Sequence, residues 1–154
     1  MTEAGATSRV VGVWKLLSCT RDIIETGERV HQYGQDPLGY LHYSREGRMI
    51  VFMLNRERPV PNDILATDAE AIALFRSMGA YMGTFSVEAN RVTHHIDASW
   101  NQSWAGTSQQ RYFRVEGDRL FLTTDEYRSA YDGKLSKYTL IWERVEEPDL
   151  HRQF

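Results

Sequence analysis

Hydrophobic and polar residues alternate along most of the chain in short runs, the pattern of β-strands that bury one face. The runs start at Gly12 and recur at 29–35, 39–44, 48–54, 83–88, 91–99, 109–115, 119–124 and 135–145. Turn-forming residues, such as Arg45-Glu46-Gly47, separate them. About eight or nine short strands indicate an antiparallel β-barrel or sandwich. A barrel of that strand number has room for about one small ligand.

One segment departs from this alternation and has the pattern of a helix. Thr67-Asp68-Ala69-Glu70 matches a capping box, in which the Thr oxygen accepts from an early free N–H and a Glu follows three residues on. Apolar residues from Ala71 to Met78 then recur at helical spacing. We predict one helix over about residues 68–80, inserted mid-chain, that plugs one barrel end or packs on the barrel wall.

Length and charge narrow the class of protein. The chain has 154 residues, which suits one domain. We expect a flexible N-terminal arm over 1–9, the barrel domain over 10–146 and a C-terminal tail over 147–154. The net charge is −3 with both signs interspersed, unlike the basic surface of a nucleic-acid-binding protein. No stretch approaches the ~18 apolar residues of a membrane span, so we expect neither nucleic acid nor membrane as a partner.

The start of the chain and its cysteine content bear on location. Residues 1–12 lack the basic start and apolar run of a signal peptide. Cys19 is the single cysteine and cannot form an internal disulfide, which fits a reducing compartment. We therefore expect a cytoplasmic protein.

Motifs near both ends of the barrel segment resemble lipocalins. Gly12-Val13-Trp14 opens the first predicted strand and Arg144 lies in the last. In lipocalins, an Arg from the final strand packs across the Trp of a Gly-x-Trp motif at the closed end of the barrel. The physical reason is that a large ring plugs the base and a guanidinium stacks on it.

Internal motifs are similar to those of the bacterial and fungal lipocalin-like domain family. They are Tyr33-Gly34-x-Asp36-Pro37-x-Gly39-Tyr40-Leu41, Tyr43-x-x-x-Gly47-x-Met49, Val92-Thr93-His94-His95-Ile96-Asp97, Trp104-Ala105-Gly106-Thr107 and Gly117-Asp118-Arg119-Leu120. The resemblance covers residues 12–145 and implies an all-β lipocalin-like barrel. Some members, and barrels of similar shape, act in pathways for secondary metabolites or aromatic compounds. Cofactor-free cyclisation or isomerisation recurs there.

Two adjacent histidines are the first candidates for chemistry. Side chains alternate along a strand, so His94 and His95 point to opposite faces. His95 shares its face with Asp97 and Ser99, and a carboxylate beside an imidazole suits a general base, although the same set would suit a solvated outer face. His94 lies on an apolar face, as a core residue or as a base lining a pocket. The sequence does not decide which of the two histidines points into the cavity.

Arg111 is the remaining candidate catalytic residue. An Arg inside a barrel needs a partner, which could be Asp97, Glu143 or a ligand carboxylate, phenolate or enolate. A structural ion pair near the rim is the other interpretation. Histidines on opposite faces cannot chelate one metal, and no other His or Cys spacing suits zinc or iron. We therefore expect no metal and no cofactor.

Aromatic residues supply most of the candidate ligand contacts. The chain has four Trp, eight Tyr and six Phe, and such side chains commonly line ligand cavities. The loop after the 91–99 strand holds Trp100 and Trp104, which we expect to cover the barrel mouth or to pack on the helix or the barrel base. The predicted ligand-binding residues are Tyr40, His42, Phe52, Ser99, Trp100, Trp104, Gln109, Tyr112 and Tyr138.

Three functions are compatible with these features. The first is binding of a small apolar or aromatic metabolite with turnover, as a cofactor-free isomerase, cyclase or lyase that uses a His base and Arg or Tyr to stabilise an oxyanion. The second is a carrier that binds such a metabolite without changing it. The third is an interaction domain whose aromatic side chains fill the interior. A Trp-rich rim would support a homodimer, but no sequence feature specifies one.

Overall fold

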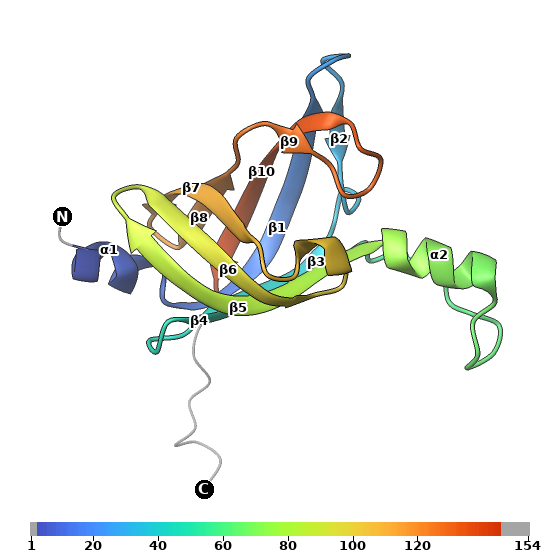
Figure 1. Cartoon of the computed structure of the whole chain (residues 1–154), viewed down its shortest axis with the longest axis horizontal. Helices are drawn as coiled ribbons and strands as arrows, with labels where there is room; N and C mark the ends of the chain where they lie inside the picture. Colours follow the sequence, from blue (N-terminus) through green and yellow to red (C-terminus); the bar gives the residue numbers. More distant parts are fainter. Residues whose placement is uncertain (1–2, 146–154) are drawn as a thin grey trace, which may run out of the picture.

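The computed structural model describes residues 3–145, so the predicted tail over 147–154 lies outside the described residues. Ten strands, two α-helices and one short 3₁₀ helix make up this part of the chain (Figure 1). In chain order they are α1 (Glu3–Val10), β1 (Gly12–Ile23), β2 (Arg29–His31), β3 (Leu38–Tyr43), β4 (Arg48–Leu54), α2 (Asp68–Arg76), β5 (Met78–Glu88), β6 (Arg91–Ser99), η1 (Gln102–Trp104), β7 (Ser108–Glu116), β8 (Arg119–Thr123), β9 (Tyr127–Arg128) and β10 (Leu135–Arg144).

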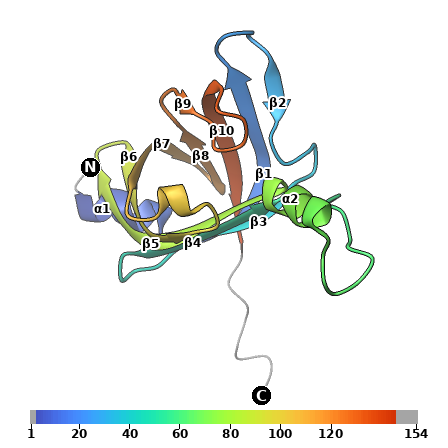
Figure 2. The ribbon, with the colours of Figure 1, turned by 45° about the vertical axis from the view of Figure 1, so that its right-hand side comes forward.

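The strands form one antiparallel sheet that closes on itself. Neighbouring strands follow the order β2-β1-β3-β4-β5-β6-β7-β8-β10-β9, and β1 also pairs with β10. Eight strands therefore form a closed barrel, while the short β2 and β9 extend its wall beyond β1 and β10 (Figures 1 and 2). Closure leaves those eight strands without a free edge. The predicted all-β barrel is confirmed.

Alternation along the strands builds the core. In β4 the side chains of Met49, Val51 and Met53 are buried, while the intervening residues point outward. In β6 the same alternation buries Val92, His94 and Ile96 and exposes His95. The barrel interior is thus filled by every second residue of each strand, as the pleat requires.

The closed end of the barrel is built around one Trp–Arg pair. Trp14 is fully buried, and the guanidinium carbon of Arg144 lies 4.1 Å from the centre of its ring. Arg144 also donates hydrogen bonds to the carbonyl oxygens of Val11 at 2.8 Å and Arg9 at 2.9 Å. The Trp14 indole N–H donates to the Val10 carbonyl at 2.8 Å. These contacts join the last strand to the chain that precedes the first.

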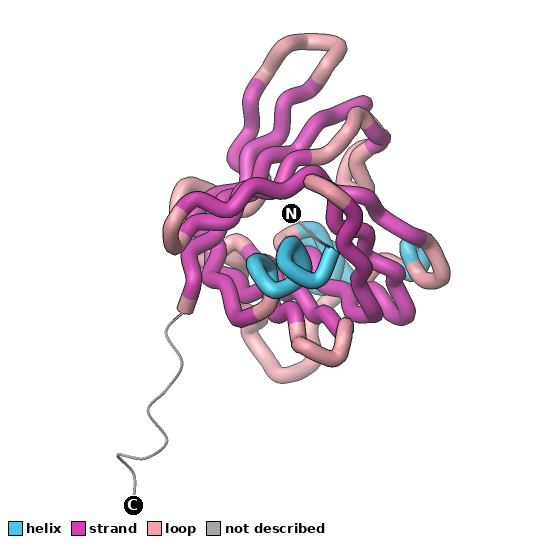
Figure 3. The backbone as a smooth tube through the Cα atoms, turned by 90° about the vertical axis from the view of Figure 1, so that its left-hand side faces the viewer, coloured by secondary structure: helices cyan, strands magenta, loops and turns pink. Residues whose placement is uncertain are grey.

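The chain before β1 is helical, which differs from the expected irregular arm over 1–9. Helix α1 lies across the closed end of the barrel (Figure 3) and buries Ala6 and Val10. Its short polar sequence contains no long apolar pattern, so the helix was not predictable from periodicity. The Trp14 and Arg144 bonds to its last residues and to Val11 stabilise it there.

The predicted helix over 68–80 is correct in its start and wrong in its end and position. Thr67 and Glu70 form the capping box, but α2 ends at Arg76 and β5 begins at Met78. Met78 and Tyr81 fit helical spacing, yet pairing of β5 with both β4 and β6 takes them into the sheet. Helix α2 has no buried residue and projects away from the barrel (Figure 1), so it neither plugs an end nor packs on the wall. No helix within residues 3–145 is long and apolar enough to cross a membrane.

The Trp14–Arg144 contact should dominate the stability of the closed end. We expect Arg144→Ala to lower the free energy of unfolding by about 2 kcal/mol, because a stacked cation and two charged hydrogen bonds are lost. Arg144→Lys should lose less, since it retains the charge without the forked donor geometry. Urea denaturation of the purified variants measures both.

Arg114→Ala is the matched control for this prediction. Arg114 also stacks on a ring, at 4.3 Å from the centre of Phe121, but its side chain is 60% exposed. We expect a loss below about 1 kcal/mol for this variant. Equal losses for Arg114→Ala and Arg144→Ala would contradict the role given to the closed end.

Candidate functional site

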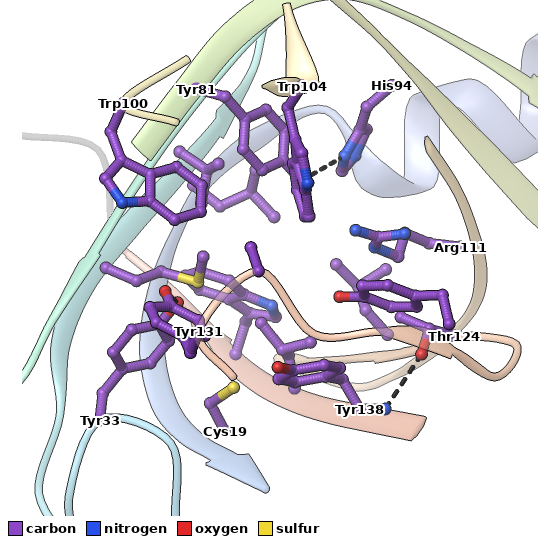
Figure 4. Close-up of a pocket in the computed structure, with 18 residues that line it drawn as sticks. Cys19, Tyr33, Tyr81, His94, Trp100, Trp104, Arg111, Thr124, Tyr131 and Tyr138 are labelled. Atoms are coloured by element: carbon purple, nitrogen blue, oxygen red, sulfur yellow. Dashed lines mark hydrogen bonds between the residues drawn. The ribbon is translucent and has the colours of Figure 1, made fainter. Parts of the chain in front are cut away.

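A cavity lies inside the barrel, and each of the eight barrel strands contributes at least one residue to its wall. Its wall is mostly apolar and aromatic (Figure 4). The cavity volume is about 50 Å³, which holds several water molecules at the ~10–15 Å³ that each needs. An apolar cavity that admits benzene measures about 150 Å³. A ring-sized ligand therefore enters this cavity only when side chains at its mouth move outward.

His94 projects into the barrel from β6 and is bound on both ring nitrogens. The Tyr43 hydroxyl lies 2.6 Å from its Nε2. The Tyr81 hydroxyl lies 2.8 Å from its Nδ1, and Figure 4 shows both side chains of this second pair. Tyr43 is completely buried behind the wall, whereas Tyr81 and His94 line the cavity. The three side chains come from β3, β5 and β6, so the closed sheet alone brings them together.

The histidine in this cluster is held in its neutral form. Burial lowers the pKa of His94 well below 6.5, and the positive charge of Arg111 lowers it further, with a contribution from His95. Burial also raises the pKa of Tyr43 well above 10. The cluster is therefore uncharged at neutral pH, with both tyrosines protonated.

Arg111 projects from β7 into the same cavity (Figure 4) and is 6% exposed. It donates one hydrogen bond to the Gln110 carbonyl, at 3.0 Å, and its guanidinium carbon lies 5.8 Å from the centre of the Tyr127 ring. Within residues 3–145, no carboxylate lies within ion-pair distance of it. None of the described residues that line the cavity is Asp or Glu. The cavity therefore carries an unneutralised positive charge on its wall.

Aromatic side chains also line the cavity beside the His94 cluster, where Trp104 packs on Tyr81 with ring centres 5.6 Å apart. Trp100 packs edge-on against Trp104, with ring centres 5.7 Å apart, and tilted against Tyr131 at 5.9 Å. The Tyr131 hydroxyl donates to the Met78 carbonyl and is bonded to the Tyr33 hydroxyl. In the described chain, the buried indole N–H of Trp100 has no hydrogen-bond partner. The Trp100 ring is therefore held by its contacts with other rings and not by a hydrogen bond of its indole N–H.

The loop that carries Tyr131 is attached to the barrel by an ion pair. Arg21, buried in β1, donates two hydrogen bonds to the carboxylate of Asp132. The hydrogen bonds from Arg21 lower the pKa of Asp132 below its usual value. The segment after β9 thereby gains a fixed position over the cavity.

Five of the predicted site residues line the cavity. They are His94, Trp100, Trp104, Arg111 and Tyr138. For the two histidines, barrel closure decides the question left open by the sequence: His94 faces inward and His95 outward. His95 lies between the hydroxyls of Ser86 and Ser108 on the outer surface.

Several predicted site residues lie elsewhere, which corrects the expectation that they face the cavity. Tyr40, His42 and Phe52 occupy the outward positions of β3 and β4, and Asp97 shares the outer face of His95. Ser99 faces the Ala80 carbonyl, Gln109 bonds to Thr107, and Tyr112 bonds to Asp125. Strands β3 and β6 have aromatic or polar residues on both faces, and β4 has apolar residues on both, so alternation alone did not distinguish inside from outside.

Sequence reasoning missed several residues of the site. They are Tyr43, Tyr81, Cys19, Tyr33, Tyr127 and Tyr131. The sequence did contain a signal for Tyr43. It lies two residues after Leu41 and shares its face of the strand, so it points away from the face of Tyr40. Tyr81 lies between the helix predicted over 68–80 and the strand predicted over 83–88, so strand alternation was not applied to it. Tyr127 and Tyr131 reach the cavity from segments whose position depends on tertiary contacts.

A closed antiparallel barrel with one internal aromatic cavity and a Trp–Arg pair at its closed end defines the lipocalin-like class. The family described as the lipocalin-like domain matches residues 11–145. The chain belongs to this family, which confirms the resemblance drawn from its motifs.

Individual relatives are more distant. A protein of Aspergillus oryzae described as a 4′-hydroxy-3′-methoxypropiophenone carrier protein is 35% identical over 66 residues, which are 38% of this chain and 60% of that protein. A lipocalin-like protein of Bacteroides uniformis overlaps 89% of this chain and 99% of its own, with 11% identity and a TM-score of 0.48. An uncharacterized protein of Bacteroides eggerthii overlaps 88% and 98%, with 9% identity and a TM-score of 0.43. The two structural similarities are too remote to bear on function.

The buried neutral histidine predicts a pH dependence of stability. Because the folded pKa of His94 lies below its unfolded value of about 6.5, the unfolded chain binds more protons below that pH. Stability should be fully present above pH 6.5 and fall as the pH drops below it, by up to about 1.4 kcal/mol per pH unit from this residue. Urea unfolding between about pH 7.5 and 5 measures the slope.

Variants at the two adjacent histidines isolate the source of that slope. His94→Phe should flatten the dependence relative to the wild type, whatever its absolute stability. His95→Gln, which changes the exposed neighbour, should leave the slope unchanged. A slope retained in His94→Phe would show that the dependence comes from other groups.

Proposed function

We propose that this protein is a carrier that holds a small aromatic molecule in the barrel cavity without changing it chemically. The observation that carries the proposal is the cavity itself, walled by aromatic rings with Tyr81, His94 and Arg111 at one end. A mostly apolar wall with a few convergent polar groups is the usual form of a small-molecule site. The relative described as a carrier for a propiophenone, an aryl ketone, supports the same role.

The alternative is a cofactor-free isomerase, cyclase or lyase acting in secondary metabolism. The donors Tyr81 and Arg111 favour it, because such groups would stabilise an enolate oxygen. A general base is also needed, and it must reach the substrate proton. His94 has both nitrogens bonded to tyrosines, and no described cavity-lining residue is a carboxylate. A carrier requires no such base, so the geometry favours the carrier.

Filling the cavity should abolish ligand binding. Val51 is buried and lines the cavity, whereas Val60 is 87% exposed and is not among the residues that line the cavity. We expect Val51→Phe to weaken the binding of acetophenone, used as the probe, at least tenfold, because the larger ring occupies the ligand's place. Isothermal titration calorimetry measures the dissociation constants.

Val60→Phe makes the same substitution outside the cavity and should bind acetophenone as the wild type does. Thermal denaturation checks that both variants fold, since overpacking a core costs about 1–3 kcal/mol. Unchanged binding in a folded Val51→Phe variant would place the probe outside the barrel and contradict the proposal.

The carrier and the enzyme differ in one measurable reaction of the same probe. A base that supports enolate chemistry would exchange the methyl protons of acetophenone with deuterium from the solvent. We expect the protein to leave the exchange rate in deuterated buffer unchanged, as followed by proton NMR. Acceleration by the wild type that is lost in Val51→Phe would instead establish the enzymatic alternative.

A further inference from the structure

We propose that the bound molecule carries an oxygen that accepts hydrogen bonds, and that Tyr81 and Arg111 donate them. The chemical class is an aromatic compound with a carbonyl or carboxylate oxygen, which enters oxygen-first. This inference rests on the proposed function and specifies which ligands the cavity prefers. It follows from the direction in which the protons of the Tyr43–His94–Tyr81 cluster point.

Tyr43, at the buried end of the cluster, determines the direction in which the hydrogen bonds are donated. Tyr43 is 0% exposed, and in the described chain its hydroxyl has one hydrogen-bond partner, Nε2 of His94 at 2.6 Å. A buried O–H that lacks an acceptor destabilises the folded protein. Tyr43 therefore donates to Nε2, so Nε2 is unprotonated. In a neutral imidazole the proton then resides on Nδ1.

The hydrogen bond from His94 to Tyr81 is donated in the same direction, toward the cavity wall. The protonated Nδ1 of His94 donates to the Tyr81 oxygen, 2.8 Å away. Burial raises the pKa of Tyr81, and the positive charge of nearby Arg111 opposes that rise. The Tyr81 oxygen thus accepts from His94, and its own proton has no acceptor among the described residues. That proton is available to a ligand in the cavity, and donation to its oxygen strengthens it as a donor.

Other polar groups on the wall are also donors. The guanidinium of Arg111 has no carboxylate partner in the described chain. The buried indole N–H groups of Trp100 and Trp142, both on the cavity wall, have no hydrogen-bond partner there either. Tyr81 and Arg111 thus present donors to the cavity. A ligand oxygen would satisfy groups that an entirely apolar ligand leaves unpaired.

Three probes of similar size separate the contributions of Tyr81 and Arg111 to ligand affinity. Acetophenone has a neutral carbonyl, benzoate has a carboxylate, and ethylbenzene has no oxygen. We expect wild-type protein to bind acetophenone about tenfold more tightly than ethylbenzene by isothermal titration calorimetry. Tyr81→Phe should reduce that preference, because Arg111 remains as a donor, and should leave the ethylbenzene affinity unchanged. Arg111→Met should weaken benzoate more than acetophenone, because it removes the charge.

Tyr138→Phe is the matched control, since it removes the hydroxyl of another tyrosine on the cavity wall. The Tyr138 hydroxyl is bonded to Ser129 at 2.7 Å, so this variant should retain the preference for acetophenone. A second readout needs no folded Arg111 variant. The infrared carbonyl stretch of isotope-labelled acetophenone should shift to lower frequency when bound to the wild type, and less in Tyr81→Phe.

The outcomes distinguish this inference from the function on which it rests. Equal affinities for acetophenone and ethylbenzene, unaltered by Tyr81→Phe, would leave the cavity a ligand site and overturn the assignment of the oxygen to Tyr81. A preference lost equally in Tyr138→Phe would also overturn it. Binding of none of the three probes would overturn the proposed function, and this inference with it.

Discussion

Pairing of the first long strand with the last is the constraint on which the rest of the structure depends. The register of β1 and β10 places Trp14 opposite Arg144, so the stacked pair forms only when the barrel is closed. Closure also removes the sheet edges that β1 and β10 would otherwise expose. Once the sheet is a cylinder, every strand has one inner face and one outer face, and the positions of the core and the cavity follow.

The two ends of the cylinder differ in how tightly they are closed. At the α1 end, the Trp14 indole and the Arg144 guanidinium bind the backbone around Val10, and the core there is fully packed. Toward the other end, large rings approach one another over a small cavity, with Trp100 contributing few hydrogen bonds. Hydrogen bonds to the backbone therefore fix the first end, whereas contacts between rings hold the second.

The polar cluster in the cavity stabilises the protein and orients protons with the same bonds. Burying a histidine costs free energy unless its ring nitrogens are bonded, and two tyrosines from separate strands bond both. Because one of those tyrosines is sealed from the cavity, the other is left with a proton directed inward. The arrangement suits recognition of an oxygen atom more directly than abstraction of a proton.

The sequence by itself determined the strands, most of their turns and the capping box of α2, because these depend on alternation and on residues close in the chain. The Trp14–Arg144 pair joins distant parts of the chain and was expected only from the resemblance to lipocalins. The sequence could not decide between His94 and His95, since a repeat of two residues defines two faces without saying which one is inside. Only closure of the barrel chose that face, and it placed Tyr40, His42 and Phe52 outside while bringing Tyr43 and Tyr81 to His94. The same holds where β5 begins: Met78 and Tyr81 fit a helix as well as a strand, and pairing with two neighbouring strands made the choice.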